Sequence, residues 1–202
     1  LWTDICITLA GGGGNGGGAV ISGNTFTNCG VGVMLTRSPY YTYHAVDELG
    51  ADNTTISGNT FNEGGEVADV WIYSQGHADD TVISGNTMNS DAGGHGVAQY
   101  AGKNLRTEVS GNIINGADEG IYIRDGTGFV VDNNQINGIG DSAMSGIHIR
   151  GGAGDVTDNT LIDADGGIVL DEVAQPPTPG TSLCSISSSS YRYGTSCTFT
   201  VA

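Results

Sequence analysis

The amino-acid sequence predicts an all-β solenoid, and three observations support this prediction. Glycine makes up 35 of the 202 residues, more than twice its usual share of about 7 %. A six-residue pattern recurs along the chain, as it does in proteins built from stacked repeats. A short segment with alternating apolar residues follows each copy, which is typical of a strand with one buried face.

The recurring pattern is an apolar residue, two polar residues, an asparagine, a variable residue and a second apolar residue. Residues 21–26 form its first copy, and successive asparagines are 35, 27, 26, 22 and 25 residues apart. These asparagines are Asn24, Asn59, Asn86, Asn112, Asn134 and Asn159. Asparagine tolerates left-handed backbone geometry and can hydrogen-bond an identical neighbour, so we expect a ladder of asparagines at a turn.

A second strand is expected after each copy of the pattern. These strands lie at residues 33–35, 70–72, 97–99, 121–123, 147–149 and 168–170. No helical segment separates them, so their apolar side chains become buried only if the coils stack at the strand spacing of about 4.8 Å. The predicted architecture is therefore a single-stranded parallel β-helix of about six to seven coils.

The alternation of I-S-G-N-T-F with G-I-Y-I-R, G-I-H-I-R and G-I-V-L resembles the repeats of the pectate-lyase-like superfamily. The resemblance covers about residues 19–172 and implies a right-handed coil. That superfamily includes polysaccharide lyases, glycoside hydrolases, adhesins and structural proteins, so the resemblance implies a fold rather than one activity. In a lyase, it would imply a basic residue that removes a proton and acidic residues that hold calcium.

Three segments are expected along the chain. Residues 1–174 form the β-helix, residues 175–180 a Pro/Gly linker, and residues 181–202 a serine-rich β tail. The four cysteines allow three pairings, and proximity favours Cys6 with Cys29 and Cys184 with Cys197. An even cysteine count with a single lysine fits a secreted protein in an oxidising compartment. Buried free thiols in a cytosolic protein are the alternative.

The charge balance excludes some partners. The chain has 22 acidic and 6 basic residues, a net charge of −16 at pH 7. Nucleic acid binding needs lysine and arginine to displace counterions, so this class of partner is not expected. No stretch approaches the roughly 18 consecutive apolar residues of a membrane helix, so membrane insertion is not expected either.

The outward positions of the second strands carry the candidate ligand-binding residues. Trp71, Tyr73, Tyr100 and Tyr122 lie at such positions in consecutive coils. Their rings would stack on sugars, or alternatively on one another along the sheet.

The same face carries the candidate catalytic and metal-binding residues. Arg124 and Arg150 occupy equivalent positions in adjacent coils, and His148 lies beside them. These three would act as base or acid in an enzyme. Asp125 and Asp171 are the candidate calcium ligands. The alternative is a set of solvated ion pairs.

We expect a secreted, non-catalytic subunit that assembles through its ends and its C-terminal tail into an extracellular filament, sheath or surface layer. The partner expected is a second copy of the chain, in a homopolymer. No cofactor is required for this assembly, and Ca²⁺ is the one ion that the acidic residues would bind. The alternatives are a polysaccharide lyase or hydrolase, and a glycan-binding adhesin module that uses the outward aromatic and arginine face.

Overall fold

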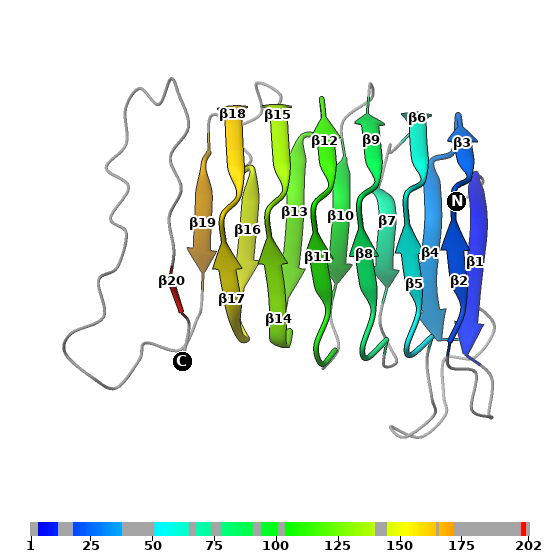
Figure 1. Cartoon of the computed structure of the whole chain (residues 1–202), viewed down its shortest axis with the longest axis horizontal. Coiled ribbons are helices and arrows are strands. Elements are labelled where there is room, and N and C mark those ends of the chain that lie inside the picture. The colour runs from blue at the N-terminus through cyan, green and yellow to red at the C-terminus, as the bar shows by residue number, and fades with distance from the viewer. Residues whose placement is uncertain are drawn as a thin grey trace.

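The protein is a parallel β-helix, as a computed structural model shows (Figure 1). The structure describes residues 4–11, 18–37, 51–64, 68–73, 78–90, 94–100, 104–139, 145–164, 166–171 and 199–200. Within these residues all regular elements are strands. This confirms the all-β prediction. None of the described elements is a helix that could cross a membrane.

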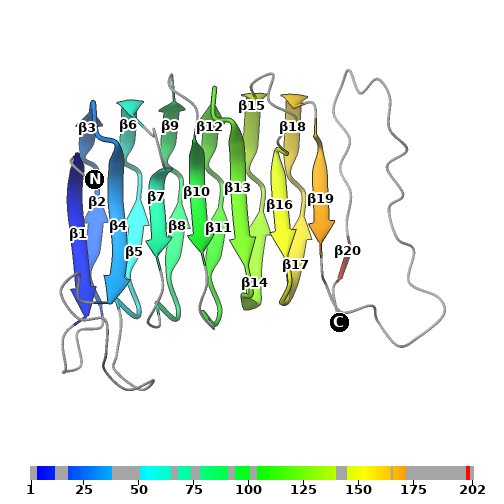
Figure 2. The same ribbon diagram turned by 180° about the vertical axis from the view of Figure 1, so that it is seen from behind.

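The strands form three sheets that run along the axis of the solenoid (Figures 1 and 2). Sheet A contains β1 (Ile5–Gly11), β4 (Val31–Arg37), β7 (Ala68–Tyr73), β10 (His95–Tyr100), β13 (Glu119–Arg124), β16 (Ile147–Arg150) and β19 (Ile168–Asp171). Sheet B contains β2 (Val20–Ser22), β5 (Thr55–Ser57), β8 (Val82–Ser84), β11 (Glu108–Ser110), β14 (Thr127–Asp132), β17 (Ala153–Thr157) and β20 (Phe199–Thr200). Sheet C contains β3 (Thr25–Thr27), β6 (Thr60–Gly64), β9 (Thr87–Ser90), β12 (Ile113–Asn115), β15 (Gln135–Ile139) and β18 (Thr160–Ala164).

The chain passes through sheets B, C and A in turn, so that β2 to β19 make six consecutive triplets. Strands of successive coils pair in parallel and in register, for example Ile56 with Ile83 in sheet B and Phe61 with Met88 in sheet C. The exception is β20, which pairs antiparallel with β17 through Val156 and Phe199.

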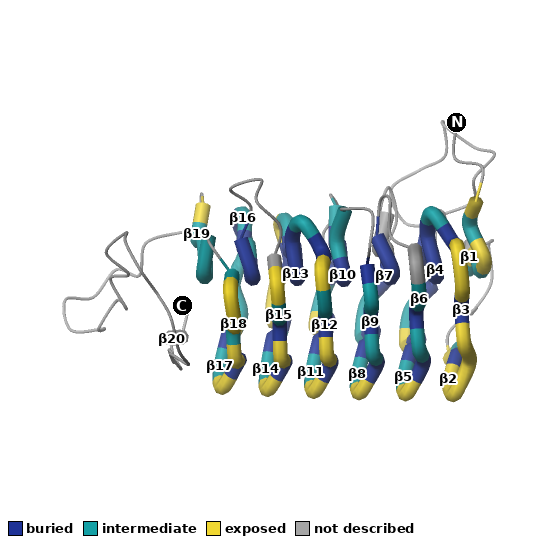
Figure 3. The backbone as a smooth tube through the Cα atoms, turned by 90° about the horizontal axis from the view of Figure 1, so that it is seen from above, coloured by how far each residue is buried: buried dark blue, intermediate teal, exposed yellow. Residues whose placement is uncertain are grey.

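The interior is filled by columns of apolar side chains. Ile56, Ile83 and Val109 follow one another in sheet B and are fully buried. In sheet C, the rings of Phe26 and Phe61 stack with centroids 4.8 Å apart. Figure 3 shows that much of β4, β7, β13 and β16 is also buried. The inward columns predicted from the repeat are therefore confirmed.

The predicted asparagine ladder lies at the turn between sheets B and C. In a typical step, Asn112 Oδ1 accepts hydrogen bonds from the backbone nitrogen and the Nδ2 of Asn86, at 3.0 and 2.9 Å. Asn86 Nδ2 also donates to the carbonyl of Ile56 at 2.9 Å. The residue before each ladder asparagine has a left-handed backbone, with φ between 51° and 65°. Glycine occupies this position in the first four coils, because it adopts that geometry without strain.

A second ladder on the outer face of sheet C was not predicted. Its members are Asn62, Asn89, Asn115 and Asn137, and the Nδ2 of each of the last three donates to the Oδ1 of the asparagine before it at 2.8 to 2.9 Å. The amides of both ladders are therefore satisfied by identical neighbours one coil away.

The predicted disulfide between Cys6 and Cys29 is present, with Cα atoms 5.8 Å apart. It joins β1 to the segment after β3, so the first strand is tied covalently to the first full coil. Cys184, Cys197 and the linker at 175–180 lie outside the described residues.

Candidate functional site

The outer face of sheet A is the candidate site, because polar residues of different kinds come together there from four coils. Strand register sets three outward rows. The first row includes His95 and Glu119, and Ser145 lies in line with them, just before β16. The second row contains Tyr122 and His148, and the third contains Arg124, Arg150 and Asp171.

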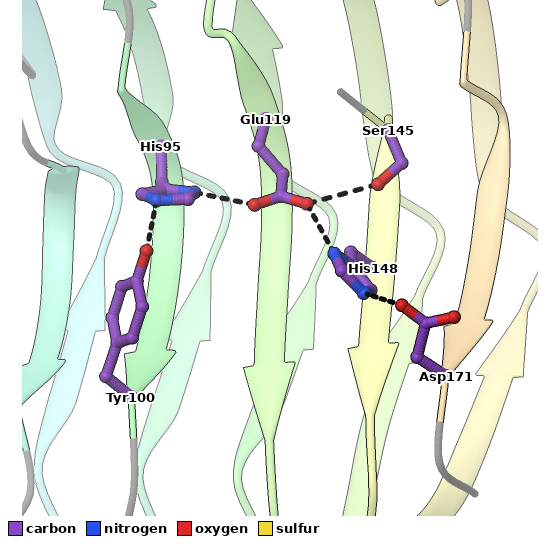
Figure 4. A network of polar contacts seen from close by, with 6 residues as sticks. All are labelled: His95, Tyr100, Glu119, Ser145, His148 and Asp171. Atoms are coloured by element: carbon purple, nitrogen blue, oxygen red, sulfur yellow. Dashed lines mark hydrogen bonds and ion pairs between the residues drawn. The ribbon is translucent and has the colours of Figure 1, made fainter. Parts of the chain in front are cut away.

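Glu119 is the centre of this face (Figure 4). It is 5 % exposed. One carboxylate oxygen, Oε2, lies 3.0 Å from His95 Nδ1. The other, Oε1, lies 2.9 Å from His148 Nδ1 and accepts a hydrogen bond from Ser145 Oγ at 3.1 Å. The carboxylate therefore joins three coils through side-chain contacts.

Two opposing effects act on the pKa of Glu119. Burial raises the pKa, because it penalises the charged form. The hydrogen bonds and charges of His95 and His148 lower it, and together they hold the pKa of Glu119 below its usual value. Glu119 is therefore a buried carboxylate that stays ionised at neutral pH.

His95 extends the network to Tyr100. The hydroxyl of Tyr100 lies 2.6 Å from His95 Nε2. One ring nitrogen of His95 faces Glu119 and the other faces the phenol, so His95 connects these two side chains. Burial, together with the charges of Glu119 and Tyr122, raises the pKa of Tyr100 to about 12. Tyr100 therefore keeps its proton at neutral pH.

His148 links Glu119 to a second carboxylate. Its Nε2 lies 3.0 Å from Asp171 Oδ2, while its Nδ1 faces Glu119. His148 therefore connects the carboxylates of Glu119 and Asp171, which lie on the strands at either side of β16.

The predicted aromatic residues differ in how they lie. Tyr122 is only 6 % exposed. Its ring lies 4.8 Å from that of Tyr100 and 5.1 Å from that of His148, between centroids. This arrangement matches the alternative in which the rings pack along the sheet. Trp71 and Tyr73 lie in register with Ala98 and Tyr100 on β10, but their side chains lie outside the described part of the chain.

The candidate catalytic arginines lie at the margin of the network. Arg124 and Arg150 are directly in register, as predicted. Arg124 Nε lies 3.5 Å from Asp125 Oδ2, and both side chains are largely exposed. His148, the third predicted catalytic residue, lies within the network.

The candidate calcium ligands are not brought together. Asp125 follows β13 and pairs with Arg124, whereas Asp171 ends β19 and contacts His148. Strand β16 lies between them. Among the described residues there is no group of three or more acidic, histidine or cysteine side chains that could hold a metal ion.

Sequence reasoning did not single out His95, Glu119 or Ser145 as site residues. A signal was present, because each of these residues directly precedes a glycine in the same coil position: Gly96, Gly120 and Gly146. Gly120 is needed there, since a Cβ would lie 2.5 Å from the carbonyl oxygen of Gly146. The repeated glycine thus marks the row that the site residues occupy.

Comparison with known proteins supports the architecture. The family model described as "Right handed beta helix region" matches residues 44–200. No curated protein and no solved structure matches the chain.

Proposed function

Because this chain belongs to the right-handed β-helix family, we propose that it is a polysaccharide-active protein that works on its glycan at the outer face of sheet A. One observation carries the proposal: Tyr100, His95, Glu119, His148 and Asp171 form one continuous chain of polar contacts across four coils. Connected ionisable groups with perturbed pKa values are characteristic of functional sites.

The network provides the groups needed to move a proton. Tyr100 holds a proton at neutral pH, and His95 is placed to exchange it. The ionised Glu119 stabilises the positive charge that His95 gains in this exchange, as a buried carboxylate does for a catalytic histidine. In this mechanism Tyr100 protonates the leaving oxygen of a glycosidic bond while a water molecule adds to the anomeric carbon, and the proton that this water loses passes through His95 to the phenolate. His148 holds Glu119 in position.

An extended polymer fits this face because the network runs along the solenoid axis rather than along one strand. The charge of −16 disfavours a polyanionic chain, so a neutral polysaccharide is the expected substrate. An acidic polysaccharide would need a cation such as Ca²⁺ to bridge carboxylates. Arg124 and Arg150 would contact the polymer beside His148.

The test is cleavage of a panel of neutral and uronate-containing polysaccharides, with new reducing ends and unsaturated products measured separately. Saturated products indicate hydrolysis, and unsaturated products indicate elimination. His95→Asn and Tyr100→Phe should each lower the rate by about 10²-fold or more, as expected for the loss of an acid–base group. Arg106→Gln is the control, because Arg106 pairs with Asp80 at an exposed turn. Full activity in both site variants, or no cleavage of any polysaccharide, would refute the proposal.

A secreted structural subunit is the second candidate function. The disulfide between Cys6 and Cys29 favours an oxidising compartment. Apolar columns also reach both ends of the solenoid, where their last residues are only partly buried. Such a subunit would assemble through its ends and C-terminal tail into a filament, sheath or surface layer. Electron microscopy of the purified chain tests this: polymers are expected, and dispersed monomers at every concentration would contradict it.

A further inference from the structure

We propose that two copies of this chain join head to tail, with β1 of one copy adding in parallel to the outer edge of β19 of the other. This inference rests on the structural role proposed as the second function and specifies its contact.

The two ends of sheet A have matching strand edges. In the described residues, β1 pairs only with β4 and β19 only with β16. All neighbours in sheet A are parallel. A second copy that follows the same axis would therefore present its β1 to β19 with the polarity that every other pair in the sheet has. Unpaired strand edges favour such addition.

The register of the inward columns specifies how the two strands would meet. Ile7 and Leu9 continue the columns of Val33 and Leu35 at one end. Ile168 and Leu170 continue the columns of Ile147 and Ile149 at the other end. Pairing Ile7 with Ile168 and Leu9 with Leu170 would make both columns continuous through the joint.

Burial shows what the contact would contribute. Val33, Leu35, Ile147 and Ile149 are fully buried within their columns, with 0 % exposure. The corresponding end residues, Ile7, Leu9, Ile168 and Leu170, are only partly buried. Stacking would remove the remaining apolar surface from water, and burial of apolar surface is the main driving force for association.

The outward side chains of the two strands do not oppose this contact. In the proposed register, Thr8 would lie beside Val169. No two carboxylates would face each other along this pair of strands. The joint is therefore compatible with the high negative charge of the chain.

Strand β20 fits this joint as a spacer in sheet B. Strand β1 lies one layer outside the coil that β2 begins. If β2 of the second copy paired directly with β17, its β1 would therefore occupy the same position as β19. The Cys6–Cys29 disulfide ties β1 to the first coil and keeps it from moving aside. Because β20 adds one further strand to sheet B beyond β17, the second copy's β2 would lie above β20 while its β1 lies above β19.

The test places a charge inside one end at a time, in the full chain. Leu9→Lys blocks the β1 end and Leu170→Lys blocks the β19 end, because an inward charge at an edge opposes pairing. Both positions are partly exposed, so the lysine can reach water in the monomer. Thr8→Lys and Val169→Lys are matched controls that place the same charge outward on the same strands. Circular dichroism checks that each variant keeps its β structure.

Analytical ultracentrifugation distinguishes the outcomes. The wild-type chain and both controls should associate as concentration rises, and each blocked variant alone should stay monomeric. An equimolar mixture of Leu9→Lys and Leu170→Lys should form dimers that grow no further, because one open end of each kind remains. Association of either blocked variant alone would overturn the head-to-tail contact while leaving the structural role in place. A wild-type chain that is monomeric at all concentrations would remove both.

Discussion

The asparagine ladder and the network around Glu119 are both buried polar structures that connect coils, but they are built differently. The ladder repeats one residue in every coil, so each amide meets an identical partner. The network uses a different residue in each coil, and its central group is charged. Repetition in a solenoid supports the stacking of coils. The polar network breaks the repetition, so regular coil stacking does not require it, and we take it as the basis of the proposed function.

The asparagine ladder and the Glu119 network also differ in whether their groups titrate. Amides donate and accept at once and do not titrate, so the ladder is satisfied at any ordinary pH. Burial raises the pKa of Glu119, whereas His95 and His148 lower it, so the charge of Glu119 responds to its surroundings. The ladder should therefore control stability, whereas the network should control activity and its pH dependence.

The largest expected effect is on the ladder. Asn112→Ala removes the acceptor of two bonds from Asn86 and the donor to the carbonyl of Ile83. These groups would be left buried without partners, so the free energy of unfolding should fall by about 4 kcal/mol. Urea unfolding measures this change. Asn24→Ala, at the exposed end of the same ladder, is the control and should have a much smaller effect. Equal losses in both variants would show that the ladder is not a main source of stability.

A smaller effect of opposite sign is expected at Asp69, where a carboxylate interrupts a row of glycines in sheet A. Asp69 is 1 % exposed and accepts a hydrogen bond from Ser90. Burial raises its pKa from 3.8 to about 6. A folded-state pKa above the unfolded value means that stability is lost as the pH rises from about 4 to about 6. Asp69→Asn should therefore raise the free energy of unfolding by about 3 kcal/mol at pH 7, with no gain below pH 4. A gain that is the same at every pH would contradict this explanation.

The smallest effect on stability is expected in the network itself. Because the pKa of Glu119 is lowered in the folded state, its stabilising contribution is present above the ordinary value of 4.5 and is lost as the pH falls through the folded-state value. Glu119→Gln should cost about 1.5 kcal/mol at pH 7, the scale of one hydrogen bond to a charged group. The difference from wild type should disappear in acid. Urea unfolding between pH 3 and pH 7 measures it, and a difference that persists at pH 3 would show that the charge of Glu119 is not its cause.

The repeat made the fold predictable from the sequence. Each coil carries the same apolar, glycine and asparagine positions, so one register explains Ile56, Asn59 and Phe61 and their counterparts. The Cys6–Cys29 pairing followed from proximity alone. The second ladder was missed because Asn62 and its partners lie outside the six-residue pattern, in strands of variable length.

The candidate site was only partly predictable. His148 and Tyr100 stood out as single residues on an outward face. Their partners did not, because the link from His95 to Glu119 depends on side-chain reach between rows rather than on a repeated position. Tyr122 was also only partly predictable. The alternation of residues along the strand predicts that its side chain points outward, but its burial results from the rings of Tyr100 and His148 beside it.

The bond between Cys6 and Cys29 also bears on how the molecule would respond to mechanical force. Coils of a solenoid contact mainly their immediate neighbours, so tension applied to the two chain termini should peel them away one by one. The covalent cross-link keeps the first strand from being stripped off the coil that follows it. Peeling should then begin with β20 and β19 and proceed toward the cross-linked end, which would be the last part of the molecule to yield.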